Sequence, residues 1–374
     1  MAQDTGPQGA PGDAAPTRIA RRSRRGLFLP YVLLLVVAAL WSAGWFWIRG
    51  RTVGEIDGWL AREAAAGRAW TCADRSVTGF PFRIELRCAT LAMERSDGRF
   101  SLGPLTAVAQ VYQPRLVLFE AAGPFHAEQG DLTGDTSWTA LRGSFHGAAE
   151  GFTRASIVVE GPRVTVAGAE PEPLLLSGRH IELHVRPSPG RYESDGAVDV
   201  SLQLAQGAVP QLDALTGNRD PADLSLDATL TRASLFGTGA VPRELERWRS
   251  AGGSLDVAAL SVAKGPQRVQ AKGSLGLDGA HRPAGQIDLR AAGVDALVGT
   301  LVGQRLGSDR GALVGQLVGG LLGLGRRAEP DPGKADAGKP DAAALKALPP
   351  LRLVDGRILF SGFPIPNVRV PALY

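Results

Sequence analysis

The stretch RVQAKGSLGLDG, residues 268–279, carries the pattern that governs most of this chain. Apolar side chains fall on alternate positions from Val269 to Leu277, with polar or charged residues or glycine between them. Because successive side chains of a β-strand point to opposite faces, such a segment has one polar and one apolar face. The same alternation recurs in HIELHV (180–185), VDVSLQL (198–204), LSLDATL (224–230) and QIDLRA (286–291).

This alternation predicts a mainly β fold with a long, curved, mostly antiparallel sheet. Clean alternation is typical of antiparallel sheets, whereas parallel sheets covered on both faces need continuous apolar runs. Roughly 14–18 such strands fit between residues 70 and 290, separated by Gly, Pro, Asn and Asp clusters. The apolar face must pack on a second sheet, on a helix or on something other than protein. The sheet is therefore expected to form either an open groove or a closed sandwich.

Residues Leu27–Ile48 form a 22-residue run without charge. About 20 apolar residues in a helix span the hydrocarbon core of a bilayer. The competing interpretation is a signal peptide, but its apolar stretch is shorter and ends in small residues, whereas three tryptophans lie in the second half of this run. Arginines cluster before it at residues 21–25, which favours a cytoplasmic N-terminus. We expect an uncleaved single-pass anchor in a bacterial inner membrane.

The two cysteines, Cys72 and Cys88, flank a predicted turn at Gly79, Phe80 and Pro81. A hairpin centred on Phe80 would place the cysteines opposite each other, close enough for a disulfide. Closing a loop of about 15 residues would contribute on the order of 3 kcal/mol. The alternative is two buried free thiols. A disulfide implies an oxidising compartment, so we expect the bulk of the chain to be periplasmic.

Glycine recurs at every fourth position from Gly299 to Gly323 within an apolar pattern of helical spacing. Gly311, Gly315 and Gly319 are the candidate helix-packing residues, because small residues four apart allow close backbone approach. Each glycine costs a helix about 1 kcal/mol, however, so local propensity opposes the pattern. The alternative is a chance ladder in two shorter core helices.

The pattern predicts seven segments. In chain order they are a disordered basic cytoplasmic tail (1–26), the transmembrane anchor (27–48), a juxtamembrane helix (49–69), a periplasmic β-rich domain (70–294), the Gly-rich helix (295–325), a Pro/Gly/charged linker (326–347) and C-terminal strands that complete the β domain (348–374).

No motif for catalysis, metal or cofactor binding stands out. Phosphate-loop, nucleophile-elbow and dinucleotide fingerprints are absent, and the histidines His180 and His184 share the polar face of a predicted strand with Glu182. The first 26 residues carry +3 of the net charge of +4, so the basic balance favours the membrane surface over nucleic acid. We expect no enzyme, no metal, no cofactor and no nucleic-acid partner, with a hydrolase of unusual site as the alternative.

Two resemblances follow from quoted segments. GFPFRIELRC (79–88), after a basic start and a single anchor, and the closing LRLVDGRILFSGFPIP (351–366) resemble the proteobacterial envelope family called domain of unknown function 2125. Residues 252–297 resemble the terminal strands of AsmA-like envelope proteins. The first resemblance implies an inner-membrane-anchored, β-rich periplasmic protein. The second implies phospholipid or outer-membrane homeostasis through a hydrophobic β groove.

Two functions compete on these grounds. The first is a groove that handles lipid or acyl chains in envelope homeostasis, with membrane lipid as the partner. The second is a non-catalytic scaffold or interaction protein with a closed β-sandwich, bound to another envelope protein through the Gly-rich helix. A continuous apolar cavity or a filled core distinguishes the two.

Overall fold

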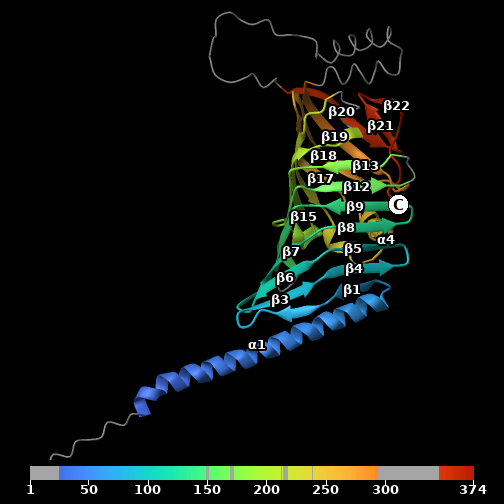
Figure 1. The fold of residues 1–374 in the computed structure, drawn as a ribbon. Coiled ribbons are helices and arrows are strands. Elements are labelled where there is room, and N and C mark those ends of the chain that lie inside the picture. Colours follow the sequence, from blue (N-terminus) through green and yellow to red (C-terminus); the bar gives the residue numbers. More distant parts are fainter. Residues whose placement is uncertain are drawn as a thin grey trace, which may run out of the picture.

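The structure is a computed structural model of the 374-residue chain. It confirms the mainly β prediction, with one long N-terminal helix followed by long antiparallel sheets (Figure 1). The residues described are 25–148, 151–168, 172–211, 213, 218–237, 239–293 and 345–374.

The helix α1, Arg25–Ala65, includes both the predicted anchor and the predicted juxtamembrane helix. Its only proline, Pro30, lies near the N-terminal end, so no proline separates the two predicted segments. The helix ends at Ala65, four residues before the predicted boundary, because the chain turns at Gly67 with a φ of +79°. By length and composition α1 is able to cross a membrane, and its most apolar part is almost entirely exposed.

One sheet has seven antiparallel strands, and its first strand lies beside the C-terminal end of α1 (Figure 1). Its strands in spatial order are β1 (Ala69–Ala73), β4 (Thr90–Arg95), β5 (Gly98–Leu102), β8 (Phe125–Gln129), β9 (Leu132–Ser137), β12 (Arg163–Ala167) and β13 (Leu174–Ser177).

The other sheet has fifteen strands, all paired antiparallel in chain order, and extends for about 67 Å at a strand spacing of about 4.8 Å. These strands are β2 (Ser76–Thr78), β3 (Arg83–Cys88), β6 (Leu105–Gln110), β7 (Gln113–Ala121), β10 (Ala140–Gly147), β11 (Phe152–Glu160), β14 (His180–Pro187), β15 (Val198–Gly207), β16 (Ala222–Leu230), β17 (Leu255–Lys264), β18 (Gln267–Leu277), β19 (Pro283–Ala292), β20 (Lys346–Val354), β21 (Arg357–Phe360) and β22 (Phe363–Arg369).

The chain passes repeatedly from one sheet to the other between β1 and β14, each time through a bend of one to three residues. Because neighbouring strands are antiparallel, all of these bends lie along the same edge, which we call the seam. The opposite strand ends are joined only by connections within one sheet, such as β4–β5 and β6–β7. In the described chain, the two sheets are therefore joined covalently along one long edge and not along the other.

Glycine and proline make several of these bends. A Cβ on Gly103 would lie 2.7 Å from the carbonyl oxygen of Ala122, so a side chain is excluded there. Gly161 has a φ of +59°, which favours glycine, and the following Pro162 is fully buried. Proline donates no backbone hydrogen bond and so ends the pairing of a strand before it changes sheet.

Short helices close the connections in the second half of the fifteen-stranded sheet. They are α2 (Tyr192–Asp195), the 3₁₀ turn η1 (Ala233–Leu235) and α4 (Val241–Ser250). Trp248 of α4 is buried, and its indole Nε1 donates a hydrogen bond of 2.7 Å to the carbonyl oxygen of Thr231. The C-terminal strands begin at Lys346, two residues before the expected start at residue 348, and they belong to this sheet. The predicted Gly-rich helix, including Gly311, Gly315 and Gly319, and the predicted linker up to residue 344 lie outside the described residues.

Candidate functional site

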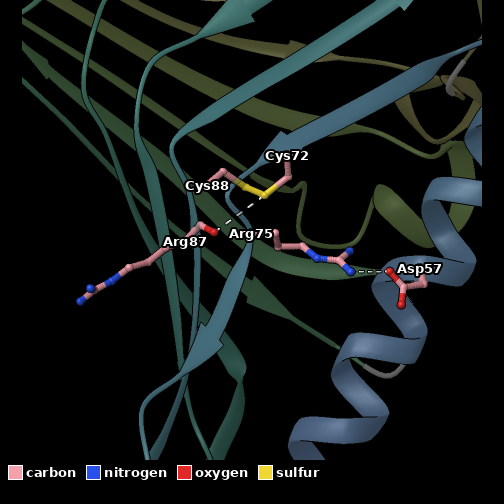
Figure 2. Close-up of a disulfide and its surroundings, with 5 residues drawn as sticks. All are labelled: Asp57, Cys72, Arg75, Arg87 and Cys88. Atoms are coloured by element: carbon pink, nitrogen blue, oxygen red, sulfur yellow. Dashed lines mark hydrogen bonds and ion pairs between the residues drawn. A yellow bond between two sulfur atoms is a disulfide. The ribbon is translucent and has the colours of Figure 1, made fainter.

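The predicted disulfide between Cys72 and Cys88 is present, with the two Cα atoms 5.1 Å apart (Figure 2). The predicted turn forms the β2–β3 hairpin, but the prediction that Cys72 lies in this hairpin opposite Cys88 is wrong. In the β2–β3 hairpin Ser76 pairs with Arg87, whereas Cys72 lies in β1 and pairs with Leu91 of β4. The chain crosses the seam at Asp74, which has a φ of +49°, so the two cysteines belong to different sheets. The disulfide joins the sheets beside the seam rather than two strands of one hairpin.

This disulfide also identifies the faces that the sheets turn toward each other. The side chains of Cys72 and Cys88 must point at one another to bond. By alternation along β1 and β3, Trp70 and Leu86 then face the same space as the cysteines. We call these the inner faces of the two sheets, and the opposite ones the outer faces.

The inner face of the fifteen-stranded sheet carries an unbroken apolar row. Direct cross-strand partners follow one another from β2 to β20, and none of them is polar or charged. The row consists of Val77, Leu86, Ala107, Phe119, Gly143, Ile157, Leu183, Leu202, Leu226, Leu260, Ala271, Leu289 and Leu348. Parallel rows on either side of it are equally apolar, for example Leu141–Val159–Ile181–Leu204–Leu224.

The side chains of this face are only partly buried. No Leu, Ile or Phe is found among the buried residues of the described chain, whose apolar members are mainly Ala and Val. The largest side chain with less than 2% exposure is that of Pro162 at the seam, and Phe145 on the inner face is 41% exposed. A filled core normally buries leucine, isoleucine and phenylalanine first. The inner face therefore differs from the core of a filled sandwich.

The seven-stranded sheet presents a matching apolar inner face that begins at α1. Trp59 of α1 contacts Trp70 of β1, and Trp70 contacts Phe100 of β5, each with ring centroids 5.3 Å apart. Phe100 in turn contacts Phe125 of β8 at 5.6 Å. The row of aromatic rings connects the helix to the interior of the protein.

The outer faces carry ion-pair networks that include His126, His180 and His184. His180 lies between Glu160 and Glu182, with ring nitrogens 2.8 and 2.7 Å from the carboxylate oxygens. The hydrogen bond with Glu182, helped by the one with Glu160, raises the pKa of His180. His184 is 3.1 Å from Glu182, so both histidines share the face of this glutamate, as the alternation predicts.

A second outer-face network surrounds His126 on the seven-stranded sheet. Its ring nitrogens lie 2.8 Å from Asp135 and 2.9 Å from Glu128. Hydrogen bonds from Arg99 and His126 lower the pKa of Glu128 to about 2. Within the described ranges, no group of three or more His, Cys, Asp or Glu side chains is arranged to hold a metal ion. These networks are typical of a polar surface.

The predicted turn residues Gly79, Phe80 and Pro81 join β2 to β3 at the end of the sheet nearest α1. Gly79 has a φ of +108°, and an added Cβ would lie 2.6 Å from the carbonyl oxygen of Arg83, which explains glycine at this position. The similar segment that begins at Gly362 joins β21 to β22. Each of the two turns thus connects the last two strands at one end of the fifteen-stranded sheet.

The fold and these faces define a mainly β protein of two apolar-faced sheets with an N-terminal helix of membrane-spanning length. A family model described as "Uncharacterized protein conserved in bacteria (DUF2125)" matches residues 45–369, and the chain belongs to that family. No curated protein and no solved structure matches the chain. The resemblance to AsmA-like proteins accordingly stays a prediction.

Sequence reasoning missed two features of the site. It left open whether the apolar face packs on a second sheet, and it did not use the Gly-Pro pairs at 103–104, 123–124 and 161–162, each of which lies at a bend between the sheets. It also missed the contacts between α1 and the first turns of the sheet, because they join residues almost forty positions apart.

Proposed function

We propose that this protein is an inner-membrane-anchored periplasmic protein whose inner faces bind the acyl chains of lipids. The observation that carries the proposal is the apolar row from Val77 to Leu348, which crosses thirteen strands without a polar side chain. A continuous apolar surface that the chain itself leaves partly exposed needs an apolar occupant.

An acyl chain fits this surface chemically. Each methylene removed from water contributes about 0.8 kcal/mol, and the row from Val77 to Leu348 contributes no side chain that needs a hydrogen bond. The partial exposure of residues such as Ile157, Leu183 and Leu226 leaves apolar area for such contacts. The polar headgroup would stay in water at the edge of the sheets that carries no seam.

The anchor and its orientation support access to membrane lipid. The helix α1 is long and apolar enough to cross a bilayer, and the arginines before it favour a cytoplasmic N-terminus. The Cys72–Cys88 disulfide favours an oxidising compartment for the sheets, which is the periplasm in a bacterial envelope. The AsmA-like resemblance of residues 252–297 agrees with lipid or outer-membrane homeostasis.

The scaffold hypothesis predicts a closed sandwich with large apolar side chains fully buried. The burial of the inner faces argues against it, because the fully buried residues of the described chain are small or lie at the seam. We infer a binding role without catalysis, since the acidic and histidine side chains described above are paired on the outer faces.

Lipid analysis of the purified protein tests the proposal. The full chain is extracted in mild detergent, and the bound lipids are quantified by mass spectrometry. Leu226→Asp places a charge on the inner face of β16, whereas Ser225→Asp places the same charge on the outer face one residue earlier. We expect lipid on the wild type and on the Ser225 variant, and a several-fold loss on the Leu226 variant. Absence of lipid from the wild type contradicts the proposal.

A further inference from the structure

The apolar part of α1 is bonded directly to the first turns of the fifteen-stranded sheet. The indole Nε1 of Trp41 donates a hydrogen bond of 2.9 Å to the carbonyl oxygen of Pro81. One helical turn later, Trp45 donates a hydrogen bond of 2.9 Å to the carbonyl oxygen of Arg83. Trp45 is only 4% exposed, so its side chain is buried in the contact between α1 and the sheet, which we call the joint.

A second turn of the same sheet belongs to this joint. The backbone N–H of Val111, in the β6–β7 turn, donates a hydrogen bond of 3.0 Å to the carbonyl oxygen of Phe82. The turn at residues 79–82 and the turn at residues 111–112 therefore lie together beside α1. We call these two turns the basal turns.

The position of this joint along α1 fixes its depth in a membrane. Trp41 lies seven residues before Ile48, the last residue of the uncharged run, which corresponds to about 10 Å along a helix. If the run ended at Trp41 instead, only 15 residues from Leu27 would remain, too few for a span of about 20 residues. Because Trp41 is hydrogen-bonded to Pro81, a bilayer that contains the whole run must also contain Pro81.

The side chains of the basal turns suit that environment. Phe82 is 60% exposed and Tyr112 is 68% exposed, although both are large and apolar or amphipathic. Phe80 stacks on Phe46 of α1 with ring centroids 5.9 Å apart, and both rings are exposed on their other sides. Aromatic side chains of this kind are enriched where a protein meets the membrane–water interface.

One arginine of α1 lies just beyond these rings, and one arginine of β3 lies beside them. Arg49 comes directly after the uncharged run, and its Nε donates a hydrogen bond of 2.8 Å to the carbonyl oxygen of Val77. The exposed Arg83 lies at the level of Trp45 and forms an ion pair of 3.1 Å with Glu85. Long arginine side chains at this level reach the headgroup phosphates while their stems stay in apolar surroundings.

A hollow of about 330 Å³ lies between α1 and the basal turns. Six residues of α1, among them Leu40, Trp41 and Gly44, line it together with Val111, and none of the lining side chains is charged. A hollow with such a lining beside a membrane-spanning helix fits lipid tails better than water.

We propose that the basal turns, residues 79–82 and 111–112, insert into the outer leaflet beside α1 and contact its acyl chains. The end of the fifteen-stranded sheet is then seated in the outer leaflet. Pro81, at the level of Trp41, lies among the acyl chains, and Val77, whose carbonyl oxygen accepts a hydrogen bond from Arg49, lies at the level of the headgroups. This inference rests on the membrane anchor of the proposed function. It adds a direct contact between the sheet and the lipid, which an anchor alone does not require.

Spin labels on single added cysteines test the insertion. The full chain carries Phe82→Cys or Tyr112→Cys and is reconstituted into nanodiscs of phosphatidylethanolamine and phosphatidylglycerol; the cysteines of the disulfide are not labelled. Leu35→Cys, exposed on α1, is the control inside the bilayer, and Leu175→Cys, exposed on the outer face of β13, is the control in water. Collision of the label with oxygen and with a water-soluble nickel chelate reports its depth.

We expect labels at 82 and 112 to collide with oxygen severalfold more than with the nickel chelate, as at residue 35 and opposite to residue 175. Chelate accessibility at 82 and 112 equal to that at 175 overturns the insertion while leaving the anchor intact. If the label at residue 35 is also accessible to the chelate, the membrane anchor of the proposed function fails together with the insertion. All four substitutions replace exposed side chains, so the fold of the variants is checked against the wild type by circular dichroism.

Discussion

Cys72 in β1 and Cys88 in β3 form a disulfide between the two sheets, at the point where the chain first bends from one sheet to the other (Figure 2). The neighbouring Arg75 forms an ion pair of 2.6 Å with Asp57 of α1, so the helix is joined to the same corner. The disulfide thus holds the end of the seam at which the sheets meet the helix.

Removal of this disulfide is expected to destabilise the protein. The bond closes a loop with a sequence separation of 16, and a loop of this size restricts the unfolded chain by about 3 kcal/mol. We expect Cys72→Ala/Cys88→Ala to lower the free energy of unfolding by about that amount, measured by urea denaturation in mild detergent. A reducing agent should destabilise the wild type similarly and leave the variant unchanged. Equal stability of wild type and variant would show that the bond does not constrain the seam.

The seam requires glycine at residue 103. A Cβ there would lie 2.7 Å from the carbonyl oxygen of Ala122, a backbone atom that cannot move without disturbing the next bend. We expect Gly103→Ala to cost about 1–3 kcal/mol of unfolding free energy. Gly134→Ala in β9 is the matched control, because the nearest atom to its added Cβ lies 4.0 Å away. If both variants unfold at the same urea concentration, the close approach of the Ala122 carbonyl oxygen does not explain the glycine at residue 103.

The His180 network makes stability depend on pH. The folded protein holds the pKa of His180 above its ordinary value of 6.5, so its contribution is fully present below pH 6.5 and is lost as the pH rises through the folded pKa. We expect the stability difference between wild type and His180→Gln to be larger at about pH 5.5 than at about pH 8.5. Both conditions lie above the ordinary pKa of Glu182, which His180 lowers further, so this carboxylate stays ionised. If the stability difference between wild type and His180→Gln were the same at both pH values, the raised pKa of His180 would be contradicted.

Much of the fold was predictable from local pattern. The alternation in segments such as VDVSLQL predicted which side chains share the inner face, because a strand has a fixed period of two. The length of the uncharged run likewise predicted a helix of membrane-spanning length.

The division into two sheets was not predictable in the same way. It depends on bends of one to three residues. The apolar–polar alternation before and after Gly103-Pro104 would be identical if both strands belonged to one sheet, so it does not indicate a change of sheet. The predicted pairing of Cys72 directly opposite Cys88 failed for this reason, since the first bend falls between Cys72 and the hairpin and Cys72 pairs with Leu91 instead. Contacts such as Trp41 with Pro81 depend on the tertiary packing of α1 and have no local signal.

Site-specific photo-crosslinking in living cells tests the central claim most directly. A benzophenone amino acid is introduced at Leu202 or at Gln203, neighbours in β15 whose side chains point to the inner and outer face respectively. The cells carry radiolabelled phospholipid and are irradiated, and the purified protein is analysed for covalently bound lipid. The account predicts strong labelling at residue 202 and background labelling at residue 203. Equal labelling at the two positions, or none at residue 202, would contradict acyl-chain binding on the inner face.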